Sequence, residues 1–186
     1  MHVLIINGHP APNASTANKH ILETIAKALP EAEVRTLAEV RGPAGFDVAA
    51  EKAALRRADV VVVLQFPYCW YAVPAVVKDW IDHVFTHGFA YGSDGTALHG
   101  KRIVFSFTTG AEASGYVKDG PMGWPVEAFL PPLLQTARMC GFAGGKVVCS
   151  TGMMVVPGVS TETDREAVLG KAQDHAARLA LLINAQ

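Results

Sequence analysis

Charged side chains are few in this sequence, and their signs nearly cancel. Lysine and arginine together number 16, and aspartate and glutamate number 17, so the formal net charge of the 186 residues is −1. Such a chain lacks the basic surface with which proteins bind nucleic acid or anionic membranes. It also lacks the strongly acidic face with which small electron-carrier proteins dock their partners. The charge balance therefore disfavours both classes of protein.

Cysteine is also scarce, and the three cysteines lie far apart at Cys69, Cys140 and Cys149. An odd number at wide spacing does not make a disulfide framework, and no spacing typical of a metal site accompanies them. The chain has no basic stretch ahead of its first apolar run, which is too short for a signal-peptide core. We therefore expect reduced thiols, no metal and a cytoplasmic location.

The apolar run at residues 60–77 has roughly the length of a membrane span. It contains Gln65, Pro67 and Pro74, however, and its first part consists of β-branched residues. This pattern predicts a strand, a loop and the start of a helix rather than a membrane span.

Half of the residues are apolar, and their spacing alternates between strand-like runs and helical periods. Ser15 is placed to cap the first helix, Pro74 to open another, and Thr161 with Asp164 to form a capping box at the last. Strand-like runs lie at 2–6, 34–37, 59–64, 103–107 and 147–150, and helical patterns at 15–29, 48–57, 76–85, a stretch ending at 140, and 161–183. Five strands alternating with helices predict one α/β domain over residues 1–186, a doubly wound parallel sheet with helices on both faces.

Ligands of such sheets bind beyond the carboxyl ends of the strands, which points to three loops at 9–18, 66–71 and 108–116. The first loop precedes a helix, whose free N–H groups and partial positive charge suit a phosphate. His9, Ser15, Thr16 and Asn18 add side-chain donors. The loop matches neither a Walker A nor a Gly-x-Gly-x-x-Gly motif, so it favours a mononucleotide phosphate, or else a polar turn with a helix cap.

The second loop, residues 66–71, is rich in large aromatic side chains. They could form a wall for a flat conjugated ring, or simply pack as core. The third loop begins with the small residues Thr108, Thr109, Gly110 and Ala111, whose backbone N–H groups could stabilise charge on a reduced cofactor ring, or form an ordinary turn. No nucleophile–base pair, carboxylate pair or metal cluster accompanies the loops, which indicates chemistry borne by a cofactor.

The central segment carries a family resemblance. Residues 65–74 (QFPYCWYAVP), 78–85 (KDWIDHVF) and 89–92 (FAYG) resemble the NAD(P)H:quinone oxidoreductase (DT-diaphorase-like) family. The chain is especially similar to short bacterial members, which include the flavoprotein subunits of glutathione-gated potassium efflux systems. The resemblance extends from residue 8 to residue 141.

The resemblance implies a flavodoxin-like three-layer sandwich with strand order 2-1-3-4-5, and a homodimer with flavin at its interface. FMN is favoured over FAD because the chain is shorter at its C-terminus than FAD-using relatives. The implied phosphate-binding residues are His9, Ser15, Thr16, Ala17 and Asn18. The implied residues around the flavin ring are Pro67, Tyr68, Cys69, Trp70, Tyr71, Thr108, Thr109, Gly110, Ala111 and Tyr116.

Tyr116 matches a tyrosine near the hydride-transfer site of the animal enzymes, and we assign it the catalytic role. Two departures bear on that role: Met122 stands where the animal enzymes have a catalytic histidine, and Ala111 stands where relatives often have glycine. The apolar surface of Trp80 and Phe85 on the helix at 76–85 exceeds what one core face needs, which supports a dimer.

The function that follows is FMN-dependent NAD(P)H:quinone oxidoreduction by a ping-pong mechanism. The alternative is a flavin-binding regulatory subunit of a potassium efflux antiporter, which would place the protein at the periphery of the inner membrane. A flavodoxin-like one-electron carrier fits the neutral charge and the aromatic loop poorly.

Overall fold

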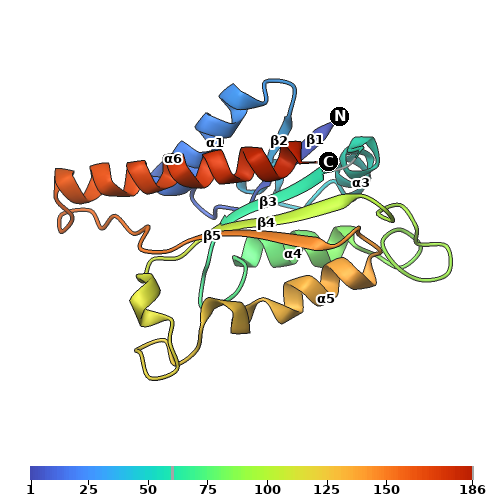
Figure 1. Ribbon diagram of the computed structural model, residues 1–186. Coiled ribbons are helices and arrows are strands. Elements are labelled where there is room, and N and C mark those ends of the chain that lie inside the picture. Colours follow the sequence, from blue (N-terminus) through green and yellow to red (C-terminus); the bar gives the residue numbers. More distant parts are fainter. Residues whose placement is uncertain (60, 186) are drawn as a thin grey trace.

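Five parallel strands form a sheet between two layers of helices in the computed structural model, which describes residues 1–59 and 61–185 (Figure 1). The strand order is β2-β1-β3-β4-β5. The strands are β1 (Val3–Asn7), β2 (Glu33–Thr36), β3 (Val61–Pro67), β4 (Arg102–Thr108) and β5 (Gly145–Ser150). The doubly wound α/β fold and the order 2-1-3-4-5 predicted from the sequence are thereby confirmed.

The central strands are apolar on both faces because each face is covered by helices. All five residues of β1 are buried, as are residues 103–108 of β4. The predicted strand at 59–64 corresponds to β3, although Val60 lies outside the described residues. The apolar run at 60–77 therefore divides as predicted, into a strand, a turn and the start of a helix at Ala75. Within residues 1–59 and 61–185, no helix is both long and apolar enough to cross a membrane.

The two helical layers enclose separate hydrophobic clusters. Helices α1 (Ala17–Ala28) and α6 (Glu162–Asn184) cover one face of the sheet. The other face is covered by α2 (Leu37–Val40), α3 (Val48–Arg57), α4 (Ala75–Val84) and α5 (Pro131–Met139). Short 3-10 turns lie at Pro12–Ala14, Ala113–Gly115 and Val126–Phe129. Figure 1 shows the long connection after β4 hanging from the end of the sheet at which α6 begins.

Several local signals act as predicted. Helix α3 spans 48–57, Pro74 is the N-cap of α4, and Thr161 and Asp164 form a capping box at α6.

Two local predictions differ from the structure by one residue. Leu37 ends the predicted second strand but begins α2, because one helical turn buries its side chain completely. Thr16, not Ser15, precedes α1, although the Ser15 hydroxyl still accepts the Lys19 N–H at 3.2 Å.

The argument for a dimer from α4 is wrong. Trp80 is 0% exposed and Phe85 is 7% exposed, so both lie in the core of this single chain. Their rings make an edge contact with centroids 5.3 Å apart, and Trp80 Nε1 donates to Glu51 Oε2 at 2.9 Å. Trp80 and Phe85 therefore pack inside this chain and offer no apolar surface to a partner.

Helix α6 is fastened to the sheet by a buried histidine. His175 is fully buried, and its ring nitrogens lie 2.7 Å from Ser106 Oγ on β4 and 2.9 Å from Ser150 Oγ on β5. Burial lowers the pKa of His175 to about 4, and the nearby charge of Arg178 acts in the same direction. The folded protein therefore holds His175 neutral.

This burial predicts a loss of stability in mild acid. Between about pH 6.5 and about pH 4 the unfolded chain binds a proton at His175 and the folded chain does not. The free energy of unfolding should therefore fall by roughly 3 kcal/mol across this window as the pH decreases. Urea unfolding at several pH values measures this free energy. Comparing its pH dependence in wild type and His175→Gln separates the contribution of His175 from that of carboxylates that titrate in the same pH range. The exposed control His87→Gln should keep the wild-type slope, and a wild-type slope equal to that of His175→Gln would contradict the account.

Candidate functional site

A cavity of about 250 Å³ opens at the carboxyl edge of the sheet, beside the start of α1. It joins all three loops that the sequence singled out. Its lining consists of His9, Ala14, Ser15, Thr16, Ala17, Asn18, Pro67, Tyr68, Thr108, Thr109, Gly110, Met153, Met154 and Val155. The predicted convergence of loops after β1, β3 and β4 is therefore present in the fold.

The start of α1 presents backbone donors to this cavity. The backbone N–H groups of Thr16, Ala17 and Asn18 make no hydrogen bond to any of the described residues. Three consecutive free N–H groups at a helix N-terminus, with the positive end of the helix dipole behind them, favour an anionic group. The arrangement supports the phosphate site expected from the sequence.

His9 adds a side-chain donor of known tautomer. Its Nδ1 accepts the Ala11 N–H at 3.0 Å, and burial lowers the pKa of the ring. A neutral ring with an accepting Nδ1 carries its proton on Nε2. His9 lines the cavity, so Nε2 can donate to an anion there.

The Asn18 side chain has a different role from the phosphate donor expected of it. It is buried; its Oδ1 accepts from Gln65 Nε2 at 2.6 Å, and its Nδ2 donates to Thr108 Oγ1 at 3.0 Å. These two bonds tie the start of α1 to β3 and β4. Asn18 therefore offers the cavity its backbone N–H, while its amide group holds the cavity together.

The loop after β4 presents further backbone donors. Thr109 is engaged within the protein, because its N–H donates to Ser150 O at 2.9 Å and its hydroxyl donates to Ala111 O at 2.9 Å. The N–H groups of Gly110 and Ala111 have no acceptor in the part of the chain that the structure describes. A Cβ on Gly110 would lie 3.2 Å from Met154 Cε, so glycine permits this close approach.

The aromatic loop divides into a buried and an exposed part. Tyr68 lines the cavity and stacks on Phe107, with centroids 4.1 Å apart and the rings 13° from parallel. Its hydroxyl donates weakly to Phe129 O at 3.5 Å, and burial raises the pKa of this phenol. Tyr68 thus serves both interpretations of the loop, as core packing and as a wall of the cavity.

Beyond Tyr68 the chain makes a tight turn that strains two aromatic residues. Trp70 and Tyr71 have φ of 51° and 63°, and Cys69 and Ala72 exchange two backbone hydrogen bonds across them. Positive φ at both central positions is typical of a type I′ turn, which asparagine and glycine favour. Trp70 is nevertheless 92% exposed, so no packing within the chain offsets the strain.

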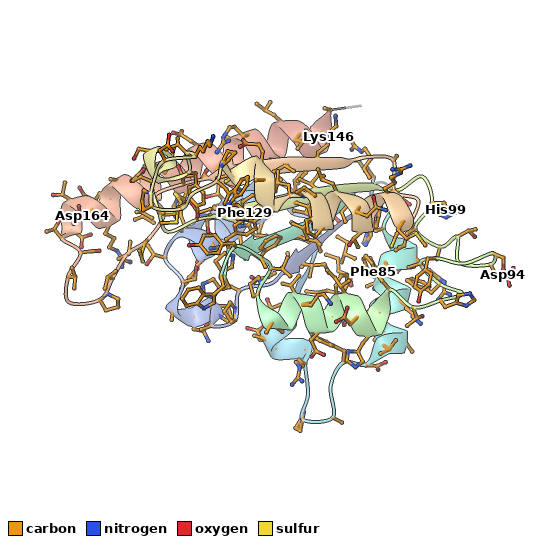
Figure 2. The ribbon with its side chains drawn as sticks, turned by 90° about the horizontal axis from the view of Figure 1, so that it is seen from below. Phe85, Asp94, His99, Phe129, Lys146 and Asp164 are labelled. Carbon is orange, nitrogen blue, oxygen red and sulfur yellow. The ribbon has the colours of Figure 1, made fainter. Side chains whose placement is uncertain are left out.

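Five of the predicted site residues lie outside the cavity lining: Cys69, Trp70, Tyr71, Ala111 and Tyr116. Tyr71 and Tyr116 both contact Phe129, a residue labelled in Figure 2, with ring centroids 5.1 and 6.4 Å from it. Tyr71 Oη also lies 3.5 Å from Met122 Sδ. Tyr116 is therefore linked to the cavity through Phe129 and Tyr68 rather than facing it directly.

A second long connection, at residues 88–101 between α4 and β4, lies far from this cavity. It leads into the amino end of β4. Figure 2 shows Asp94 and His99 at the end of the molecule opposite Asp164, which stands in the first turn of α6. In this chain the long loop therefore takes no part in the cavity.

Sequence reasoning missed the residues after β5. Met153, Met154 and Val155 line the cavity, and Met153 N–H donates to Thr109 O at 2.9 Å. The signal was topological rather than chemical, because β5 also ends at the carboxyl edge, next to β4. Two methionines and a valine carry neither the donors nor the aromatic rings by which the other loops were found.

The cavity can hold a ligand that has an anionic group at one end and a flat, hydrogen-bonding portion at the other. The anionic end would meet the start of α1 and His9, and the flat portion would meet Tyr68 and the N–H groups after Thr109. Within the described ranges, no group of three His, Cys, Asp or Glu side chains is placed to bind a metal ion. The free backbone N–H groups and His9 Nε2 are all donors, so the set suits an anion.

Comparison with solved structures places this arrangement among known proteins. The chain is 33% identical to general stress protein 14 of Treponema denticola, whose crystal structure is a complex with FMN, with a TM-score of 0.82 over 98% of this chain and 99% of that one. It is 26% identical to a thermophilic tryptophan halogenase of Streptomycin violaceusniger, with a TM-score of 0.74 over 94% of this chain and 97% of that one.

An NADPH-quinone reductase of P. pentosaceus shares the fold at 22% identity, with a TM-score of 0.73 over 95% of this chain and 98% of that one. The names of these three proteins differ, so the shared fold does not by itself specify a substrate. The family model described as a flavodoxin-like fold matches residues 1–176. The chain therefore belongs to this family of flavodoxin-like fold.

Proposed function

We propose that this protein binds FMN and transfers reducing equivalents from NAD(P)H to a quinone. The observation that carries the proposal is the set of free N–H groups of Thr16, Ala17 and Asn18 at one end of a cavity walled by Tyr68. Bound FMN supplies a ring that accepts a hydride from a reduced nicotinamide and passes two electrons on. The FMN complex of general stress protein 14 supports the cofactor, and the P. pentosaceus reductase supports the reaction class.

The residues present fit the parts of FMN in turn. The phosphate would accept from the α1 N–H groups, from the hydroxyls of Ser15 and Thr16, and from His9 Nε2. The ring would lie along Pro67 and Tyr68, with the N–H groups of Gly110 and Ala111 donating to its edge. Donors fixed before reaction stabilise negative charge as it develops, at no cost of reorganisation.

The exposed aromatic turn completes the proposed site. Trp70 and Tyr71 stand next to the wall residue Tyr68 and would cover a ring that extends past the cavity. If one open face serves both NAD(P)H and quinone, the oxidised nicotinamide has to leave before the quinone enters, which gives ping-pong kinetics. The resemblance assigns the proton-holding role to Tyr116 Oη, although Tyr116 packs against Phe129 rather than lining the cavity, and Met122 has no proton to give.

Oligomeric state and membrane partners remain proposals. Large apolar side chains are exposed on the loops that follow β3 and β4, with Trp70 at 92% and Trp124 at 63%. A second copy of the chain that covers them would make the homodimer expected from the resemblance. The potassium efflux antiporter stays a prediction from the sequence alone.

The phosphate end of the site is tested by removing one backbone donor. Thr16→Pro removes an N–H at the start of α1, where the extended conformation of Ser15 tolerates a following proline. The dissociation constant for FMN should rise about tenfold or more, since hydrogen bonds to charged groups contribute roughly 1.5–3 kcal/mol. Thr16→Ala, which keeps the N–H, is the matched control. Riboflavin, which lacks the phosphate, should bind wild type and Thr16→Pro equally; an equal loss for both ligands would sink the assignment.

Relieving the strain at Trp70 should stabilise the folded protein and weaken its binding of FMN. Trp70→Asn places a residue that tolerates positive φ at an exposed position, so the unfolding free energy of the ligand-free protein should rise by about 1 kcal/mol. FMN should bind the variant more weakly, because the ring loses its cover. Leu181→Gln replaces another exposed apolar residue, without positive φ, near the C-terminal end of α6, and should change neither quantity. A variant that gains no stability, or binds FMN as tightly as wild type, contradicts the role given to Trp70.

Tyr116 is tested by removing its hydroxyl. Tyr116→Phe should leave FMN bound and slow the reduction by NADPH about tenfold, the effect of losing one donor that strengthens in the transition state. Stopped-flow absorbance measures the rate directly. Equal rates in wild type and Tyr116→Phe would show that Tyr116 only packs against Phe129.

A further inference from the structure

A line of buried hydrogen bonds runs from the cavity through the sheet to the surface of α6. Seven side chains take part, from α1, β3, β4, β5 and α6. In order they are Thr108, Asn18, Gln65, Ser106, His175, Ser150 and Arg178, joined by contacts of 3.0, 2.6, 2.5, 2.7, 2.9 and 2.6 Å. Five of the seven have less than a tenth of their surface exposed. We call this line the polar relay.

The inner half of the polar relay has a defined direction. Gln65 donates to Asn18 through Nε2, so its Oε1 is the acceptor for the Ser106 hydroxyl. A serine hydroxyl has one proton, and that of Ser106 goes to Gln65. The contact between Ser106 Oγ and His175 Nε2 therefore needs a proton on the histidine.

The outer half of the polar relay continues in the same direction. A neutral His175 with its proton on Nε2 accepts at Nδ1, and the Ser150 hydroxyl is the donor 2.9 Å away. The Arg178 guanidinium donates to Ser150 Oγ at 2.6 Å and to Cys149 O at 3.1 Å. A guanidinium is always protonated and only donates, so the Ser150 hydroxyl accepts from Arg178 and keeps its own proton for His175 Nδ1. Its charge also disfavours a proton on the nearer ring nitrogen.

The direction has a consequence at the cavity end. Thr108 Oγ1 accepts from Asn18 Nδ2, which leaves its own proton to be donated elsewhere. Thr108 lines the cavity, and the rest of residues 1–59 and 61–185 offers its hydroxyl no acceptor. The polar relay thus starts at a permanent cation and ends in a hydroxyl proton facing the ligand.

We propose that Arg178, Ser150 and His175 are positioning residues that fix the Thr108 hydroxyl as a hydrogen-bond donor to the bound ligand. The ligand atom at Thr108 is then an acceptor, an oxygen or a nitrogen. This inference rests on the proposed function for the identity of the ligand as FMN. It adds that ligand binding depends on Arg178, Ser150 and His175, which do not line the cavity.

The first test needs no ligand. In the ¹⁵N-labelled full chain near neutral pH, long-range ¹H–¹⁵N spectra report which ring nitrogen of His175 carries the proton, and His175→Gln identifies its signals. The Nε2–H tautomer is the expected result. The Nδ1–H tautomer would reverse the polar relay and overturn the proposal, whether or not the protein binds FMN.

The second test measures FMN binding by fluorescence in variants that cut the polar relay at a distance. Ser150→Ala should raise the dissociation constant at least about fivefold, a typical coupling between separated sites. Ser150→Thr keeps the hydroxyl and should restore wild-type binding. Thr108→Val, which removes the terminal donor, should raise the constant about tenfold. Arg138→Met, which replaces an exposed arginine on α5, is the control and should bind as wild type does.

The double variant separates positioning from simple packing. If Ser150 acts through Thr108, adding Ser150→Ala to Thr108→Val should weaken FMN binding no further. Additive losses, an unchanged constant in Ser150→Ala, or equal losses in Ser150→Thr and Ser150→Ala would each overturn the proposal. A wild-type protein that binds no FMN would instead refute the proposed function, and with it the role of Thr108, while the tautomer of His175 would still be measured.

Discussion

A buried amide at the start of α1 has to find partners, and the ones it finds hold the functional edge of the sheet together. Asn18 bonds Gln65 at 2.6 Å on β3 and Thr108 at 3.0 Å on β4. Burial makes an unsatisfied amide costly, so these bonds fix the helix start against two strand ends. The free N–H groups of Thr16, Ala17 and Asn18 are aimed into the cavity as a result. The positions of these free N–H groups and of the cavity wall at Tyr68 therefore depend on the bonds of one residue.

Two features of this chain, the strained turn at Trp70 and Tyr71 and the buried His175, are not required by the fold itself. Trp70 and Tyr71 occupy left-handed conformations that shorter polar residues favour, and Trp70 is almost fully exposed. Strain without compensating contacts is typical of positions kept for a ligand or a partner. The buried histidine of α6 is the second such feature, since an apolar residue would fill its place between two strands without needing Ser106 and Ser150. Under the proposed function the strained turn covers the ligand directly, and the histidine acts on it through the polar relay.

The fold could be predicted because a strand that is buried on both faces consists of an unbroken run of apolar residues, whereas helices show apolar residues at helical spacing. The bounds of α3 and the capping box at Thr161 followed from local chemistry, and the sheet order followed from the resemblance. The rest depends on contacts distant in sequence. The residues next to Asn18 in sequence do not show that its side chain bonds Gln65. In the same way, the sequence around Trp80 does not show its bond to Glu51, and that around Met153 does not show its bond to Thr109. Site loops were found where they carry donors or aromatic rings, and the aliphatic and methionine-rich segment after β5 was missed.

The account's central claim is that the cavity at the start of α1 holds a redox-active FMN. The most direct measurement is the visible spectrum of the purified protein with FMN under anaerobic conditions, recorded before and after NADPH and again after a quinone. The account predicts a protein-bound flavin spectrum that bleaches with NADPH and returns with the quinone. A protein that leaves added FMN free in solution, or a bound flavin that neither NADPH nor NADH bleaches, would contradict it.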